Sequence, residues 1–280
     1  MDTSLLVRVG GFIAAVGLLG AVVAYFVIFE TVRIPPPAGP ALPLPTAENP
    51  SSFPHEALDR VLKRFVDEQG RVDYPALTAD RTELERYMVA LAQTSPDKDP
   101  AAFPTDADRL AYWINAYNAT VLYAVTAQPA LTSVGDNKYK FFALTRYVFG
   151  EAATSLYALE NFIIRRRFDE PRIHFALNCA STGCPKLPAE AFMPNQLQNQ
   201  LARETRAFCA DPKKVRLHDG RIELSKIFEW YADDFEKDGG AVAFCQKWGR
   251  SDLPGDAEIQ FVPYDWSLNV QPKNHHRRPS

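Results

Sequence analysis

The spacing of hydrophobic residues divides this chain into a long apolar run, a proline-rich segment and a region of periodic patterns. Residues 9–29 carry no charged side chain, and a run of this length crosses about 30 Å of hydrocarbon as a helix. It is longer than the apolar core of a cleaved signal peptide, and no clear Ala-x-Ala cleavage site follows it. The pattern therefore predicts one uncleaved transmembrane helix.

The side of the membrane follows from the order of the segments. The charges that flank the apolar run, Arg8 on one side and Glu30 with Arg33 on the other, barely decide its orientation. A single N-terminal span followed by an extended spacer is a common tether for an exported domain. We therefore expect a single-pass membrane protein with its N-terminus in the cytoplasm and its globular domain on the extracytoplasmic (periplasmic) side.

Residues 30–52 form the spacer. Proline dominates Ile34–Pro45, and because its ring fixes φ and removes the backbone donor, such a segment stays extended as polyproline II. It then acts as a stiff linker. A docking motif for a proline-binding partner is the alternative. The globular domain is expected to begin near Phe53.

Within the globular region most apolar residues recur every three or four positions, which is helical spacing. The most regular pattern runs from Asp106 to Thr126 and places Leu110, Ile114 and Tyr117 on one face. Helices are expected at residues 55–69, 80–92, 106–126, 156–167, 194–209, 226–235 and 241–248.

Three other segments have the pattern of strands. The apolar run 172–177 after Pro171 predicts a strand followed by a loop. Residues 215–224 alternate about Asp219-Gly220, a strong signal for a two-residue hairpin, and residues 260–266 predict a last short strand. The expected fold class is α+β: a predominantly helical globular domain with a small, partly antiparallel sheet, preceded by one transmembrane helix.

Composition adds one conclusion, which is that nucleic-acid binding is not expected. The chain has 280 residues and a net charge of −3, so it lacks the basic surface that nucleic-acid binding requires. Its basic clusters are short: Arg165–Arg167 lies in a predicted helix, and residues 271–280 are expected to be a disordered basic tail. The expected partners are therefore the membrane and an unidentified small molecule or envelope component.

The residues best suited to chemistry lie between Pro171 and Pro185, where one histidine and two cysteines, His174, Cys179 and Cys184, occur within a short stretch. Two further cysteines are Cys209 and Cys245, and the helical pattern assigns Cys245 to the core. In an oxidising compartment any pair that is close in space can form a disulfide. Four cysteines allow three connectivities, which sequence alone does not separate.

Three polar residues border apolar helix faces and are candidates to support such a site. Asparagine is a mediocre residue inside a helix, so Asn115 and Asn118 are expected to make specific hydrogen bonds, either to neighbouring loop carbonyls or to a ligand. Glu160 lies on the edge of an apolar face and needs a partner. That partner is either an arginine or His174, which the carboxylate would orient.

Five motifs follow one another along the globular region: Ala111–Ala119, Ser155-Leu156 with Leu159-Glu160, Pro171–Ser181 with Cys184-Pro185, Leu224–Phe228 with Trp230-Tyr231, and Tyr264–Asn269. With them the chain resembles the protein family of unknown function DUF547 over roughly residues 55–270. The implied organisation is a tail at 1–8, a transmembrane helix at 9–29, a linker at 30–52, a DUF547-like domain at 53–270 and a tail at 271–280.

The resemblance has one departure and one chemical hint. The family often has histidine directly after the glutamate, whereas this chain has Asn161, so a mechanism that needs this second histidine is not implied. Similar domains are fused to glutaredoxin-like modules in some larger proteins, which points to thiol chemistry.

The leading hypothesis is a thiol site for hydrolysis, group transfer or redox chemistry in a membrane-tethered extracytoplasmic domain. Cys179 would be the thiol, with Cys184 as a second candidate, and His174 the base that activates it. The orienting carboxylate would be Glu160 or Asp265. The amide of Asn115 or Asn118 would stabilise an oxyanion.

Two alternatives stay open. His174, Cys179 and Cys184 could bind zinc together with Asp265 or Glu160, although the usual second pair of ligands is missing. Otherwise the chain is a non-catalytic binding or structural module, in which a Cys179–Cys184 disulfide closes the loop or the thiols are merely buried. No cofactor other than this zinc is expected.

Overall fold

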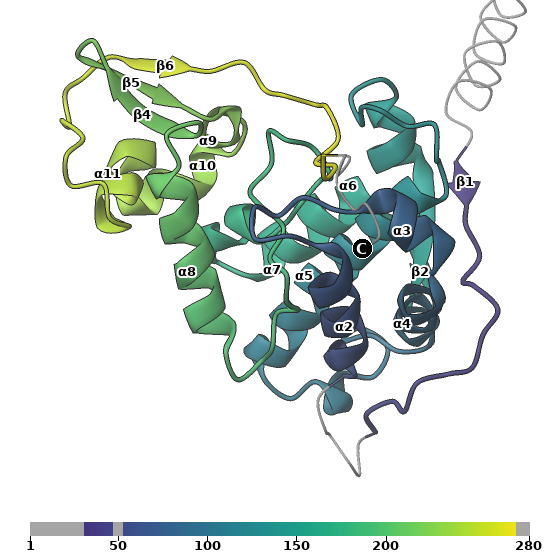
Figure 1. Ribbon diagram of the computed structural model, residues 1–280. Coiled ribbons are helices and arrows are strands. Elements are labelled where there is room, and N and C mark those ends of the chain that lie inside the picture. Colours follow the sequence, from purple (N-terminus) through teal and green to yellow (C-terminus); the bar gives the residue numbers. More distant parts are fainter. Residues whose placement is uncertain (1–30, 47–52, 273–280) are drawn as a thin grey trace, which may run out of the picture.

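The computed structural model describes residues 31–46 and 53–272. Two buried clusters of hydrophobic side chains organise them, one in a large helical lobe and one in a small lobe built from residues 211–261. In Figure 1 the small lobe, with β4, β5, β6 and α11, lies to one side of the helices α2 to α7. The helix α8 connects the lobes, because Leu197 and Leu201 belong to the first cluster and Phe208 and Cys209 to the second.

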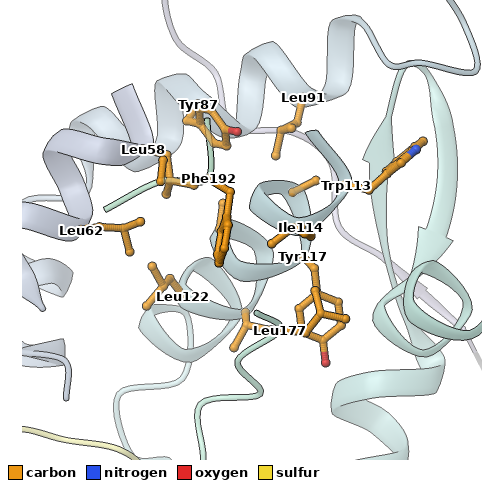
Figure 2. Close-up of a cluster of buried hydrophobic side chains, with 14 of the residues drawn as sticks. Leu58, Leu62, Tyr87, Leu91, Trp113, Ile114, Tyr117, Leu122, Leu177 and Phe192 are labelled. Carbon is orange, nitrogen blue, oxygen red and sulfur yellow. The ribbon is translucent and has the colours of Figure 1, made fainter. Parts of the chain in front are cut away.

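The large lobe is built around α5, which is buried on most of its surface. Thr105 starts this helix with a capping box: its hydroxyl accepts from the Asp108 N–H at 3.1 Å, and Asp108 accepts from the Thr105 N–H at 3.0 Å. Figure 2 shows side chains from neighbouring elements gathered round Ile114 and Tyr117. The helices of this lobe are α2 (His55–Phe65), α3 (Tyr74–Ala79), α4 (Thr82–Gln93), α5 (Asp106–Thr126), α6 (Leu156–Ala158) and α7 (Arg165–Arg167).

Shorter helical turns connect these helices and carry several pocket residues. Pro100–Ala102 and Pro171–Phe175 are 3₁₀ turns, and Tyr139–Leu144 and Leu159–Ile164 are π-helical turns. π-helical turns often occur at functional sites. The helices of the rest of the chain are α8 (Leu197–Ala210), α9 (Lys226–Trp230), α10 (Ala232–Phe235) and α11 (Gly240–Lys247), with a 3₁₀ turn at Glu236–Asp238.

Two three-stranded sheets share one plan, an antiparallel hairpin with a third strand added in parallel. In one, β2 (Thr145–Phe149) pairs with β3 (Ala152–Ser155) and with β1 (Val32–Arg33). In the other, β5 (Arg221–Leu224) pairs with β4 (Val215–His218) and β6 (Ile259–Phe261). Asp219 and Gly220 both have positive φ, 50° and 75°, as the tight hairpin turn requires.

The last described residues return from the small lobe to the large one (Figure 1). Single β-bridges join Ser181 to Leu268 and Val72 to Val270. The segment after β6 therefore passes beside residues 179–184, the cysteine loop, and it brings Tyr264 and Trp266 there.

The expected fold class and localisation need correction. Residues 9–29, where we expect the transmembrane helix, lie outside the described residues. Within residues 31–46 and 53–272, no helix is both long enough and apolar enough to cross a membrane. This finding contradicts a fold class and a single-pass localisation that both rest on such a helix. The described residues form an α+β fold with two small sheets.

Several local predictions are confirmed and others are wrong. The helix at Asp106–Thr126 and the hairpin at 215–224 form as expected. The strand expected at 172–177 is instead the 3₁₀ turn Pro171–Phe175, whose first turn is held by the Glu170 carboxylate accepting from the Arg172 N–H. A short apolar run does not distinguish a buried strand from a buried turn.

The proline-rich segment also differs from the expected spacer. It lies along the large lobe: Leu42 is buried, and Ile34 and Leu44 pack against the first cluster. The Ile34 N–H donates to the Arg146 carbonyl at 2.8 Å, which continues the pairing of β1. Of the expected tail at 271–280, residues 273–280 lie outside the described residues.

Candidate functional site

A pocket of about 740 Å³ opens where the two lobes meet. This volume is in the range that holds a drug-sized ligand. The turn Pro171–Phe175 lies at the boundary, because Ile173 belongs to the first hydrophobic cluster and Phe175 to the second. His174, between them, lines the pocket. The other lining residues are Tyr117, Lys138, Tyr139, Phe142, Ala143, Tyr157, Glu160, Asn161, Arg165, Leu177, Cys179, Cys184, Pro185, Ile227, Trp230, Tyr231, Tyr264 and Trp266.

The His174 ring is fixed by Asp234 of α10. Its Nε2 lies 2.6 Å from Asp234 Oδ2, and the Arg165 guanidinium donates to both oxygens of the same carboxylate, at 2.7 and 2.9 Å. Burial raises the pKa of Asp234, but the hydrogen bonds from His174 and Arg165 outweigh it and hold that pKa well below its usual range. Asp234 is therefore an ionised acceptor, and the His174 Nε2 carries the proton.

With the proton of this hydrogen bond on Nε2, the other ring nitrogen, Nδ1, is the atom that can accept a proton. No described residue donates a hydrogen bond to His174 Nδ1. The arrangement of carboxylate, imidazole and unpartnered ring nitrogen is the one that general bases use. The His174 side chain is buried, with 1% of its surface exposed, and it forms part of the pocket lining.

Tyr231 contacts both His174 and Glu160. Its ring stacks on the imidazole at a centroid distance of 4.0 Å, and the Arg165 guanidinium lies 4.7 Å from the centre of the same ring. Its hydroxyl donates to Glu160 Oε1 at 2.5 Å. Burial and the Glu160 charge raise the pKa of Tyr231 and of Tyr117, so both phenols keep their protons. Figure 2 shows the Tyr117 hydroxyl pointing away from the other labelled core side chains.

Cys179 and Cys184 form a disulfide that lines the pocket. The two sulfurs differ in their surroundings, since Cys179 is half-buried and Cys184 is 6% exposed. The Cys179 N–H donates to Cys184 Sγ at 2.9 Å. The Tyr264 hydroxyl lies 3.2 Å from Cys184 Sγ and 3.3 Å from Cys179 Sγ, so a phenol reaches both sulfurs.

Lys214 and Tyr264 both pack against the backbone of the cysteine loop. Lys214 donates to the carbonyls of Thr182 and Gly183 at 2.8 and 2.7 Å, and burial lowers the pKa of this lysine to about 8. A Cβ at Gly183 would lie 2.7 Å from Cε1 of Tyr264. Glycine is therefore needed there for the Tyr264 ring to approach the sulfurs.

The two asparagines hold backbone segments and do not line the pocket. Asn115 donates to the Phe192 carbonyl at 2.7 Å and accepts from the N–H of the same residue at 2.9 Å. Asn118 bonds the Ala176 carbonyl and the Asn178 N–H, both at 2.9 Å. Both amides bond backbone groups, and neither residue is part of the pocket lining. Asn118 instead fixes the chain between His174 and Cys179.

Neither predicted orienting carboxylate is hydrogen-bonded to His174. Glu160 accepts from the Tyr231 hydroxyl, whereas Asp265 accepts from the N–H and hydroxyl of Ser267, at 2.9 and 2.6 Å, outside the pocket lining. Asp234 takes the role. The predicted zinc site is not assembled either: in the described ranges no three or more His, Cys, Asp and Glu side chains lie close enough to hold a metal ion, and the two sulfurs are bonded to each other.

The residues that sequence reasoning missed are Asp234, Arg165, Tyr231 and Tyr264. Arg165 belongs to a run of three arginines whose composition is typical of a solvated surface. Asp234 follows Tyr231 by three residues, so a helical continuation places both on one side. Tyr231 and Tyr264 belong to two of the family motifs. Their pairing with sulfur and glutamate depends on contacts between segments 71 to 85 residues apart.

Comparison with known proteins gives one finding. No curated protein and no solved structure matches the chain. The family model described as "Protein of unknown function, DUF547" matches residues 102–209. This segment contains α5, Glu160, Arg165, His174 and both disulfide cysteines, while Tyr231, Asp234 and Tyr264 follow it. The resemblance to the DUF547 family is therefore confirmed by a family-model match over residues 102–209.

Proposed function

We propose that this pocket carries out thiol–disulfide exchange through the Cys179–Cys184 bond. The observation that carries the proposal is the difference between its two sulfurs. Cys179 is the more exposed one, so it is the sulfur that a substrate thiolate reaches. Cys184 is the buried one, and it receives hydrogen bonds from the Cys179 N–H and the Tyr264 hydroxyl.

This asymmetry matches what exchange requires. Rates depend on which sulfur is accessible and on how stable the departing thiolate is. A substrate thiolate attacks Cys179 Sγ, the S–S bond breaks, and its electron pair leaves on Cys184 Sγ. A second substrate thiolate then attacks the substrate sulfur of the mixed disulfide and releases Cys179 as a thiolate. Two substrate thiols become one disulfide, and the protein's disulfide becomes two thiols.

His174 supplies the proton acceptor for this scheme. Only the thiolate attacks, and a thiol that enters the pocket needs a base to lose its proton near neutral pH. The unpartnered Nδ1 of His174 has this capacity, and Asp234 stabilises the imidazolium that forms. The proton then passes to the thiolate of Cys184.

The direct test is reduction of the native protein by a small thiol. The full chain is titrated in buffers of defined dithiothreitol redox ratio, quenched by alkylation and analysed by peptide mass spectrometry, while circular dichroism reports folding. We expect Cys179 and Cys184 to become labelled together while the fold persists. Cys209 and Cys245, both fully buried, serve as internal controls. Reduction that occurs only when the protein unfolds would contradict the proposal and favour a disulfide that merely closes the loop.

A further inference from the structure

The mouth of the pocket is unusually aromatic. Three of the eight large hydrophobic residues that are exposed in the described part of the chain line it: Tyr139 at 72%, Tyr157 at 51% and Trp230 at 45% exposure. They come from three different elements. Phe162, 54% exposed, packs edge-on against Tyr157 at 6.0 Å between ring centres and extends the surface outside the mouth. Large exposed aromatic side chains that gather at a pocket are typical of a binding site.

The aromatic surface continues inward to the disulfide. Trp230 contacts Tyr264 at 4.7 Å between ring centres, and Tyr264 contacts Trp266 at 4.6 Å. Tyr264 is also the residue whose hydroxyl reaches both sulfurs. A ligand that packs against Trp230 therefore lies beside the ring that adjoins Cys179.

The charges of the pocket argue against a small anionic thiol. Arg165 is occupied by Asp234 and Asn161, and Glu160 by Tyr231. Lys138 alone among the lining cations makes no ion pair with a described residue, and its Nζ lies 5.6 Å from the ring centres of Tyr139 and Trp266. A tripeptide thiol such as glutathione brings two carboxylates, for which a single open cation is a poor complement.

We propose that the thiol substrate of this site is a cysteine within an extended polypeptide segment, flanked by aromatic or aliphatic side chains that pack against Tyr139, Tyr157 and Trp230. This inference rests on the proposed exchange function and names its substrate class. A peptide cysteine reacts by the same steps as any substrate thiol, and its sulfur is bonded to Cys179 in the mixed disulfide.

The test compares three thiols in single-turnover reduction of the oxidised full chain: N-acetyl-Phe-Cys-Leu-amide, N-acetyl-Ser-Cys-Gly-amide and 2-mercaptoethanol. We expect the aromatic peptide to react about tenfold faster than the polar one, which corresponds to ~1.4 kcal/mol of differential binding. Trp230→Ala and Tyr157→Ala should each reduce the ratio of the two peptide rates several-fold. Leu217→Ala, at an exposed residue of β4 outside the pocket lining, is the matched control and should leave that ratio unchanged.

The outcomes separate the two claims. If 2-mercaptoethanol reduces the native disulfide and the two peptides react at equal rates, the substrate class is wrong while the exchange function stands. If no thiol reduces the folded protein, the exchange function itself fails. Binding of the corresponding Phe-Ser-Leu peptide, followed by tryptophan fluorescence, gives a second readout that does not depend on chemistry. A Trp230→Ala variant with unchanged affinity for it would also overturn the proposed substrate class.

Discussion

The protein contains two pairs of neighbouring cysteines in opposite surroundings. Cys179 and Cys184 line the pocket between the lobes, bonded to each other, with the Tyr264 hydroxyl beside both sulfurs and His174 in the same lining. Cys209 and Cys245 lie 3.7 Å apart, fully buried among the aromatic side chains of the small lobe, as free thiols. The Cys209 thiol and burial raise the pKa of Cys245, which suppresses its thiolate.

The difference shows what makes a cysteine pair reactive. Thiolate character and access decide reactivity, and a buried thiol in apolar surroundings is inert. The pocket pair has donors for a departing thiolate and an ordered base in the same cavity. The core pair has neither, and we expect it to contribute packing only.

The largest expected effect comes from removing the accessible sulfur. Cys179→Ala should abolish thiol–disulfide exchange, because neither attack nor the mixed disulfide is then possible. The double variant Cys209→Ala/Cys245→Ala should exchange at the wild-type rate and lose only packing, about 1–2 kcal/mol of unfolding free energy. Both are measured by peptide-resolved alkylation and urea denaturation. Equal losses of exchange in the two variants would erase the distinction between the pairs.

Next in size is the carboxylate that orients His174. Asp234→Asn removes the charge that fixes the tautomer and stabilises the imidazolium, so exchange at neutral pH should slow by about tenfold or more. The effect should shrink at high pH, where the substrate thiol ionises without a base. Asp233→Asn is the matched control, because this neighbouring carboxylate is exposed. A pH-independent loss would assign Asp234 a structural role only.

A smaller effect is expected at the phenol that adjoins both sulfurs. Tyr264→Phe keeps the ring contacts with Trp230 and Trp266 but removes one hydrogen bond to the departing thiolate. We expect reduction of the disulfide to slow roughly three- to tenfold. The rate is measured by rapid mixing with dithiothreitol, followed by alkylation to stop the reaction. Tyr147→Phe, at a buried tyrosine outside this pocket, provides the comparison. An unchanged rate would remove Tyr264 from the mechanism.

The smallest expected effect is a pH dependence at Lys214. Its pKa in the folded protein is about 8, below the ordinary 10.5, because burial disfavours the charged form. Between these two values the unfolded chain binds more protons, so this residue makes the free energy of unfolding rise with pH. Below pH 8 the cost of burying the charge is fully present. Relative to wild type, Lys214→Met should lose this rise, whereas exposed Lys213→Met should keep it. If the urea midpoints of wild type and Lys214→Met change with pH in the same way, this expectation is wrong.

Local patterns predicted much of the scaffold. The capped helix α5 and the Asp219-Gly220 turn are specified by residues next to one another, and both form where expected. The strand at 172–177 fails because its apolar residues serve two different cores, Ile173 the first and Phe175 the second. No periodicity within six residues carries that information.

The candidate site was predictable only where neighbouring residues in the sequence carry the signal. His174, Cys179, Cys184 and Glu160 were found from their own neighbourhoods, and all four line one pocket. Their partners were not found, because Asp234 reaches His174 across 60 residues and Tyr264 reaches Cys179 across 85. Which of several nearby carboxylates meets an imidazole depends on how the lobes pack, and a single sequence does not encode that in any local pattern.

The most direct test of the central claim is which of the two cysteines forms a mixed disulfide faster in the folded protein. Cys184→Ser and Cys179→Ser are each incubated at neutral pH with a small disulfide, and the mixed disulfides are located by peptide mass spectrometry. The account predicts rapid capture at Cys179 in the first variant and at least tenfold slower capture at Cys184 in the second. Equal rates, or faster capture at Cys184, would contradict it.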